Sequence, residues 1–151
     1  MRELIGDRFG LLQGSASHSV APRRLSTLVV ASEIQYGTQL AELVRLLGHE
    51  ARFTTSVREA IELLDVRMPQ LVFTELALPD GTASQLANAV HARTTFLCGM
   101  AALLKKELGL VELGALWRAG FDAVLSSPCD KSSLAAMLDW FQARLPVAPV
   151  N

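Results

Sequence analysis

Two short apolar runs constrain the fold of this 151-residue chain more than any other feature. Residues 27–31 read TLVVA and residues 71–75 read LVFTE, and both runs are rich in β-branched and other apolar side chains. Strands that are apolar on both faces occur in parallel sheets that helices cover on both sides. The two runs therefore predict a buried parallel sheet.

Between these two runs, the apolar residues recur with the spacing of an α-helix. A first helix is predicted to end at Gly48, because the row of apolar residues along one side of the helix stops there. A second helix is predicted to begin at the capping box of Ser56 and Glu59, and Pro69 prevents its continuation. The stripe of the first helix consists of Leu40, Leu43, Val44 and Leu47, and that of the second of Val57, Ala60, Ile61 and Leu64.

The same alternation continues to the end of the chain. Residues 100–119 are predicted to be helical, as one kinked helix or two short ones, because Gly109 and Gly114 interrupt them. Five alternations of strand and helix require right-handed crossovers and an α/β fold, with sites outside the carboxyl ends of the strands. The other predicted elements are strands at 50–54, 94–99 and 122–126, a helix at 83–92, and a last helix capped by Asp130 with Leu134, Met137, Leu138 and Phe141 inward.

The chain is expected to form one domain at residues 25–145. Residues 1–24 are predicted to be an N-terminal extension and linker, and residues 146–151 a C-terminal tail. The apolar side chains of the extension offer an alternative, in which it folds back over the domain surface. Those side chains are Leu4, Ile5, Phe9 and Leu12.

Charge and cysteine content exclude several function classes. The 14 Lys and Arg residues are balanced by 15 Asp and Glu residues, so neither direct nucleic-acid binding nor membrane binding is expected. Two cysteines are too few for a secreted disulfide scaffold and favour a reducing cytoplasm. No signal peptide and no membrane-spanning run is recognised.

Four motifs together resemble the receiver domain of two-component response regulators. They read TLVVASE, GHEARFTTSVREAIELL, MPQLVFTELALPDGTA and AGFDAVLSSPCDKSSLAAML, and they cover residues 25–145 in the expected order. The resemblance implies a CheY-like, flavodoxin-like doubly wound sheet of five parallel strands in the order 2-1-3-4-5, with helices on both faces.

The residues that the resemblance assigns to phosphorylation are all replaced. The magnesium-binding acidic pair falls on Ala31 and Ser32, and the phosphate-accepting aspartate falls on Glu75. Phosphoryl transfer needs a divalent ion and a cation around the transferring oxygens, so no catalytic residue, metal or cofactor is expected. The conserved hydroxyl falls on Gly99, the aromatic switch on Val124 and the lysine on Ser127.

Glu75 has two interpretations at this stage. Its charge imitates a phosphorylated aspartate loosely. The alternative, which we favour, is a solvated carboxylate at a loop edge that accepts backbone N–H bonds. A residual phosphoacceptor function of Glu75 also stays open.

Two further signals concern surfaces and thiols. More apolar residues occupy 100–119 than one helix stripe needs, so an interface is predicted there, and Trp140 is expected on the same side; a thicker local core is the alternative. Cys98 and Cys129 are placed near one rim as a possible redox pair, although buried core filling is favoured. The candidate interface residues are Leu108, Val111, Trp117 and Trp140.

These observations favour a degenerate receiver without enzyme activity. We expect a phosphorylation-independent interaction or dimerisation module of bacterial signal transduction. Its partner would be a histidine kinase, a regulator, another signalling protein or a second copy of the chain. Besides the residual phosphoacceptor, another hypothesis is a small-molecule or redox sensor that uses the space left by the small residues Ala31, Gly99 and Ser127.

Overall fold

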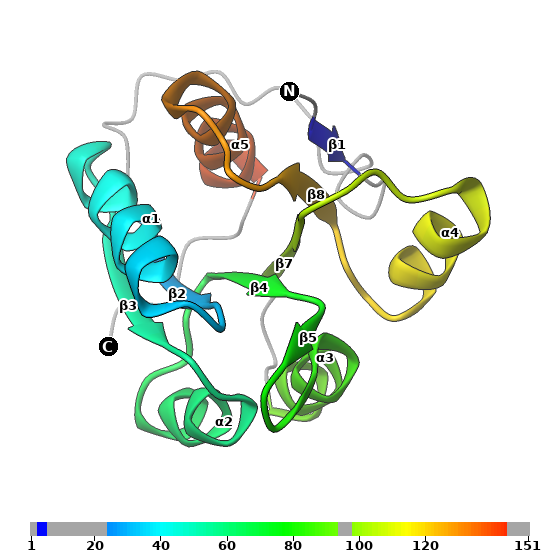
Figure 1. Ribbon diagram of the computed structural model, residues 1–151. Coiled ribbons are helices and arrows are strands. Elements are labelled where there is room, and N and C mark those ends of the chain that lie inside the picture. Colours follow the sequence, from blue (N-terminus) through cyan, green and yellow to red (C-terminus); the bar gives the residue numbers. More distant parts are fainter. Residues whose placement is uncertain (1–2, 6–23, 94–97, 145–151) are drawn as a thin grey trace.

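The computed structural model describes residues 3–5, 24–93 and 98–144, and its centre is a six-stranded sheet (Figure 1). Five strands are parallel and follow the order 2-1-3-4-5 among themselves, which confirms the predicted fold. They are β2 (Ser26–Val30), β3 (Glu50–Thr54), β4 (Leu71–Glu75), β7 (Gly99–Leu104) and β8 (Ala123–Ser126).

The helices cover both faces of the sheet. Figure 1 shows α1 and α5 on one side, α2 and α3 on the other, and α4 towards the end of the sheet where β7 and β8 lie. Strands β5 (Ala77–Leu78) and β6 (Gly81–Thr82) form a separate small hairpin before α3. The helices are α1 (Ile34–Leu46), α2 (Val57–Val66), α3 (Ala83–Arg93), α4 (Leu110–Arg118) and α5 (Lys131–Arg144).

The core consists of two hydrophobic clusters, one on each face of the sheet. Phe73 and Phe141 are fully buried in the cluster beneath α1 and α5, whereas Leu86 and Phe121 belong to the cluster beneath α2 and α3. All five residues of β4 are buried. Strand β4 is therefore the apolar centre that its sequence predicts.

The predicted helix boundaries depend on caps that the structure contains. Gly48 follows α1 with a φ of 97°, a backbone conformation that favours glycine. The Ser56 hydroxyl accepts the Glu59 N–H at 3.0 Å, and Asp130 accepts the Ser133 N–H at 2.8 Å. The four predicted inward residues of α5 are all buried: Leu134, Met137, Leu138 and Phe141.

The fourth parallel strand and the helix after it differ from the prediction. The strand occupies Gly99–Leu104 rather than 94–99, and helix begins at Leu110 rather than at 100. Alanine and leucine are strong helix formers, but burial on both faces of the sheet overrides that propensity in a run this short. Gly109 caps α4, and its N–H donates to the Glu112 carboxylate at 2.9 Å. Residues 94–97 lie outside the described residues.

Part of the N-terminal segment joins the sheet. Strand β1 (Glu3–Ile5) pairs antiparallel with β8, and Leu4 lies opposite Val124. The segment is therefore not wholly a linker, although the domain boundaries at 24/25 and 145/146 stay predictions. Phe9, Leu12, residues 13–23 and the tail at 146–151 lie outside the described residues.

Membrane insertion through a helix finds no support in the described residues. None of their helices combines the length and the apolar character that crossing a bilayer requires.

Gly37 is a sharp test of the contact between α1 and β3. A Cβ atom on Gly37 would lie 2.0 Å from Phe53 Cε1, so Gly37→Ala must displace the phenyl ring. We expect a loss of about 1–3 kcal/mol in the free energy of unfolding, measured by denaturant titration. The control is Gly114→Ala on α4, where the Cβ would meet the flexible Arg118 guanidinium at 3.3 Å and stability should hold or rise. Unchanged stability of Gly37→Ala would contradict this packing.

Candidate functional site

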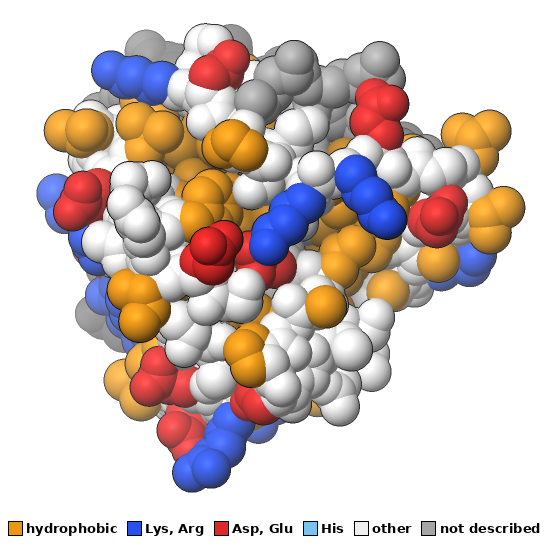
Figure 2. All heavy atoms as spheres, viewed as in Figure 1, with side chains coloured by type: hydrophobic (Ala, Val, Ile, Leu, Met, Phe, Trp, Pro, Cys, Tyr) orange, Lys and Arg blue, Asp and Glu red, His pale blue; other side chains and the backbone are white. Residues whose placement is uncertain are grey.

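All five parallel strands end at one rim of the sheet, and four of them bring the predicted or contacting residues there. The residues directly after β2, β4, β7 and β8 are Ala31, Leu76, Lys105 and Ser127. Figure 2 shows acidic and basic side chains gathered near the middle of this face. Because ligands of such folds bind outside the carboxyl ends of the strands, this rim is the candidate site.

Glu75 is the last residue of β4, and its side chain is buried at 5% exposure. Its Oε1 atom accepts two hydrogen bonds from Ser32, one from the backbone N–H and one from the hydroxyl, both at 2.8 Å. Hydrogen bonds to an ionised carboxylate are about twice as strong as neutral ones. Glu75 thus ties the loop after β2 to the end of β4.

The second oxygen of Glu75 faces a lysine. Lys105 Nζ lies 3.8 Å from Oε2, which is buried and has no hydrogen-bond donor among the described residues. Because the Lys105 side chain is 63% exposed, solvent screens the pair and limits it to about 1 kcal/mol. The carboxylate is therefore bound on one side and balanced electrostatically on the other.

These contacts overturn the interpretation of Glu75 as a solvated carboxylate. They also show that a hydroxyl and an ammonium group do contact it, from Ser32 and Lys105 instead of the positions at Gly99 and Ser127. Sequence analysis missed Lys105 because it placed the fourth strand five residues too early. The signal was present: Lys105 is the first charged residue after the buried run.

Gly99 is at the wrong end of the strand to serve the site. It begins β7, and its N–H donates to the Gln70 carbonyl at 2.8 Å. A Cβ there would lie 2.5 Å from Phe141 Cε1, so the glycine is explained by packing beneath α5. The placement of the conserved hydroxyl position on Gly99 is wrong.

The remaining predicted positions lie at or below the rim. Ala31 is fully buried, and Val124 is buried in β8. Ser127 is half-buried and donates its N–H to the Leu104 carbonyl at 2.7 Å. Burial raises the pKa of the Tyr36 hydroxyl, the nearby Ser127 acts in the opposite direction, and Cys129 and the Glu75 charge raise it further. Tyr36 therefore extends the polar cluster of the rim.

The donor set does not fit a magnesium ion. Magnesium requires near-octahedral oxygen ligands and commonly binds one or two carboxylates, but Glu75 is already hydrogen-bonded and faces an ammonium group. No group of three or more His, Cys, Asp and Glu side chains is placed to hold a metal within the described part of the chain. Ala31 and Ser32, which follow β2, contribute no carboxylate beside Glu75.

The two thiols do not form a pair. Cys98 precedes β7 at the amino end of the sheet, whereas Cys129 follows β8 at the carboxyl end. They also pack against different clusters on opposite faces of the sheet. The expectation that both lie near one rim was wrong because β7 is displaced along the chain.

The candidate interface residues divide between the two faces. Leu108 and Trp117 pack against the cluster beneath α2 and α3, and Trp140 packs against the opposite cluster, so the tryptophans are not on the same side. Trp140 makes an edge-on contact with the Phe141 ring at 5.0 Å between centroids. Val111 remains 80% exposed at the start of α4, beside Leu110 at 88%.

The comparisons with known proteins identify the fold. No family model matches the chain. A receiver domain (CheY-like) from Methylobacillus flagellatus superposes with a TM-score of 0.67 at 24% identity, over 79% of this chain and 99% of that one. The chemotaxis protein CheY4 of Vibrio cholerae gives 0.73 at 16% identity, over 79% and 99%. The chain has the fold of a CheY-like receiver domain.

One curated relative is much longer than this chain. An uncharacterized 76.5 kDa protein in the phbC 3′ region of Thiocystis violacea is 22% identical over 117 residues. The match covers 78% of this chain but 17% of that protein, so this chain spans a small part of its relative.

The thiols provide a pH-dependent prediction for the site. Burial raises the pKa of the Cys129 thiol to about 11, and Cys98 is 1% exposed. Since the thiolate is the reactive form, alkylation of the folded protein by iodoacetamide should be slow at pH 8 and accelerate as the pH approaches 11. Mass spectrometry of the alkylated protein, with a denatured sample as control, measures this. Rapid modification of folded Cys129 at pH 8 would contradict it.

Proposed function

We propose that this chain is a receiver-like module that acts through protein contacts without being phosphorylated. One observation carries the proposal: the Glu75 carboxylate is buried and already bound within the chain. An acceptor oxygen must be free to attack a phosphoryl group in line, with a metal ion beside it. Here Ser32 holds one oxygen and Lys105 faces the other.

The charges at the rim support a module that stays in one signalling state without modification. The carboxylate of Glu75 sits between a hydroxyl and an ammonium group, the two kinds of group that would recognise a phosphorylated aspartate. A glutamate supplies its charge continuously, so no kinase or phosphatase is needed to set it. We infer that the module is constitutive, with Glu75 in place of the modification.

The partner surface is proposed at the start of α4. Leu110 and Val111 are exposed there, while Leu113 and Trp117 anchor the other side of the helix on the core. Exposed aliphatic side chains on a helix favour contact with a protein over contact with a nucleic acid. The partner would be a histidine kinase, a regulator, another signalling protein or a second copy of this chain.

A magnesium and beryllofluoride titration tests the proposal. Beryllofluoride with magnesium imitates a phosphoryl group on an acceptor carboxylate, so thermal unfolding of the wild-type protein should be unchanged by it. The comparison variant combines Ala31→Asp, Ser32→Asp and Glu75→Asp, which restores the carboxylates expected from the resemblance. We expect that variant to gain a magnesium-dependent rise in Tm.

The opposite result in the wild type would favour the residual phosphoacceptor. A magnesium-dependent rise in Tm that Glu75→Gln abolishes would show that Glu75 still accepts phosphoryl groups. Incorporation of phosphate from a kinase would then be the next measurement.

A further inference from the structure

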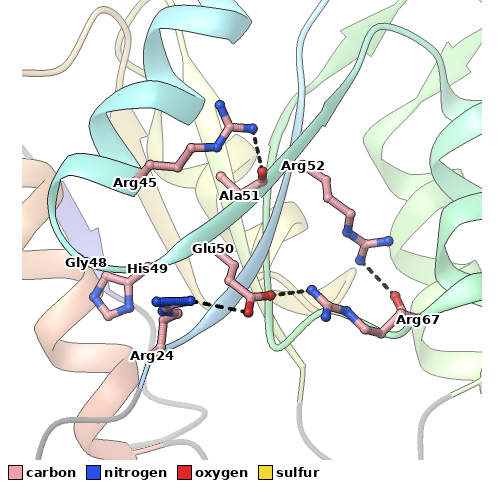
Figure 3. A pocket seen from close by; sticks show the side chains of 8 residues that line it. All are labelled: Arg24, Arg45, Gly48, His49, Glu50, Ala51, Arg52 and Arg67. Atoms are coloured by element: carbon pink, nitrogen blue, oxygen red, sulfur yellow. Dashed lines mark hydrogen bonds and ion pairs between the residues drawn. The ribbon is translucent and has the colours of Figure 1, made fainter.

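A second site lies at the opposite end of the sheet from Glu75. A hollow of about 470 Å³ opens where β2 and β3 begin, and Figure 3 shows its lining. Four arginines reach it from four separate segments: Arg24 before β2, Arg45 on α1, Arg52 on β3 and Arg67 after α2. These segments are separate in the sequence, so the tertiary fold assembles the lining of the hollow.

The lining of the hollow carries more positive than negative charge. Glu50 supplies the one carboxylate among the lining residues of the described structure, against four guanidinium groups. Arg67 forms an ion pair with it, and Arg24 Nη1 lies 3.8 Å from its second oxygen. Three positive charges therefore stay uncompensated within the lining.

Neutral acceptors hold the other two arginines in place. Arg45 donates to the Ala51 carbonyl at 2.6 Å, and Arg52 donates to the Arg67 carbonyl at 2.8 Å (Figure 3). A carbonyl oxygen orients a guanidinium group but does not cancel its charge. Both groups are thus fixed before any ligand arrives, which reduces the entropy lost on binding.

One donor of Arg52 lacks an acceptor. Its Nε–H is buried and has no hydrogen-bond partner among the described residues. Leaving a buried donor of a charged group unsatisfied is costly, but this nitrogen is shielded from solvent, so the Arg52 side chain must move before an anionic oxygen can satisfy it. Burial lowers the pKa of the Arg52 guanidinium, and the neighbouring charge of Arg67 lowers it further, as expected where like charges crowd.

His49 adds a neutral group to the same wall. Its Nδ1 accepts the Leu25 N–H at 2.9 Å, so the proton of the neutral ring is on Nε2. Burial lowers the pKa of His49, Arg24 lowers it as well, and Asp139 acts in the opposite direction. The ring therefore favours its neutral form and does not add to the charge.

We propose that this hollow binds a small polyanion through phosphate oxygens. Guanidinium groups bind phosphate in a bidentate manner, and the volume lies within the range of small-molecule pockets, roughly 300–1,000 Å³. No Phe, Tyr or Trp side chain lines the hollow within the described residues, so charge is its dominant feature. The phosphate groups themselves are what the site recognises.

The experiment uses inorganic pyrophosphate and the whole chain. In ¹H–¹⁵N spectra, the Nε–H resonances of Arg24 and Arg67, whose side chains are 64% and 55% exposed, should shift saturably with pyrophosphate. The double variant Arg24→Gln, Arg67→Gln should weaken binding by about tenfold or more, and Glu50→Gln should strengthen it by removing the internal competitor. The matched control for each single change is Arg58→Gln, which lowers the net charge by one, as Arg24→Gln or Arg67→Gln does alone, but lies outside the hollow, where Arg58 is 85% exposed and pairs with Glu62.

Several outcomes would overturn the proposal. These are the lack of a saturable shift in the wild type, an equal loss of affinity in Arg58→Gln, and an unchanged affinity in Glu50→Gln. Citrate serves as a carboxylate polyanion, and binding as tight as that of pyrophosphate would contradict recognition of phosphate. Thermal unfolding of each variant establishes that it is folded, and the site is independent of Glu75, so either proposal can fail alone.

Discussion

A buried carboxylate must be hydrogen-bonded or balanced where it lies, and Glu75 imposes that requirement on the rim of this sheet. Ser32 meets it from the loop after β2, and Lys105 meets it from the end of β7. Three segments that are far apart in the sequence are thereby connected at one point. Ala31 and Ser32 bring no carboxylate to this point, and the charge that faces Glu75 is the ammonium group of Lys105.

Most of the fold could be predicted from local chemistry. Runs such as LVFTE are apolar on both faces, and the caps at Ser56 and Asp130 mark where helices begin. The stretch GMAALL could not be assigned in this way, because alanine and leucine favour helix and its burial depends on neighbouring strands. Because the fourth strand was predicted five residues too early, the predicted site included Gly99 and omitted Lys105.

The contacts of Glu75 could not have been obtained from spacing alone. Its partners come from positions 43 residues before it and 30 residues after it along the chain, and side-chain direction decides which of them it reaches. The arginine hollow has the same origin, since a nearly neutral chain gathers four guanidinium groups at one end of its sheet. Net charge therefore excludes a broad basic surface but says nothing of a local one.

The central claim is that the Glu75 carboxylate is bound by Ser32 and Lys105 and is closed to a divalent ion. Manganese(II), a paramagnetic substitute for magnesium, tests it directly by broadening the amide resonances near its binding site. The account predicts that the Ser32 and Leu76 amides broaden no more than that of Gly48, at the far end of the sheet. Selective broadening of Ser32 and Leu76 at low manganese concentration would contradict it.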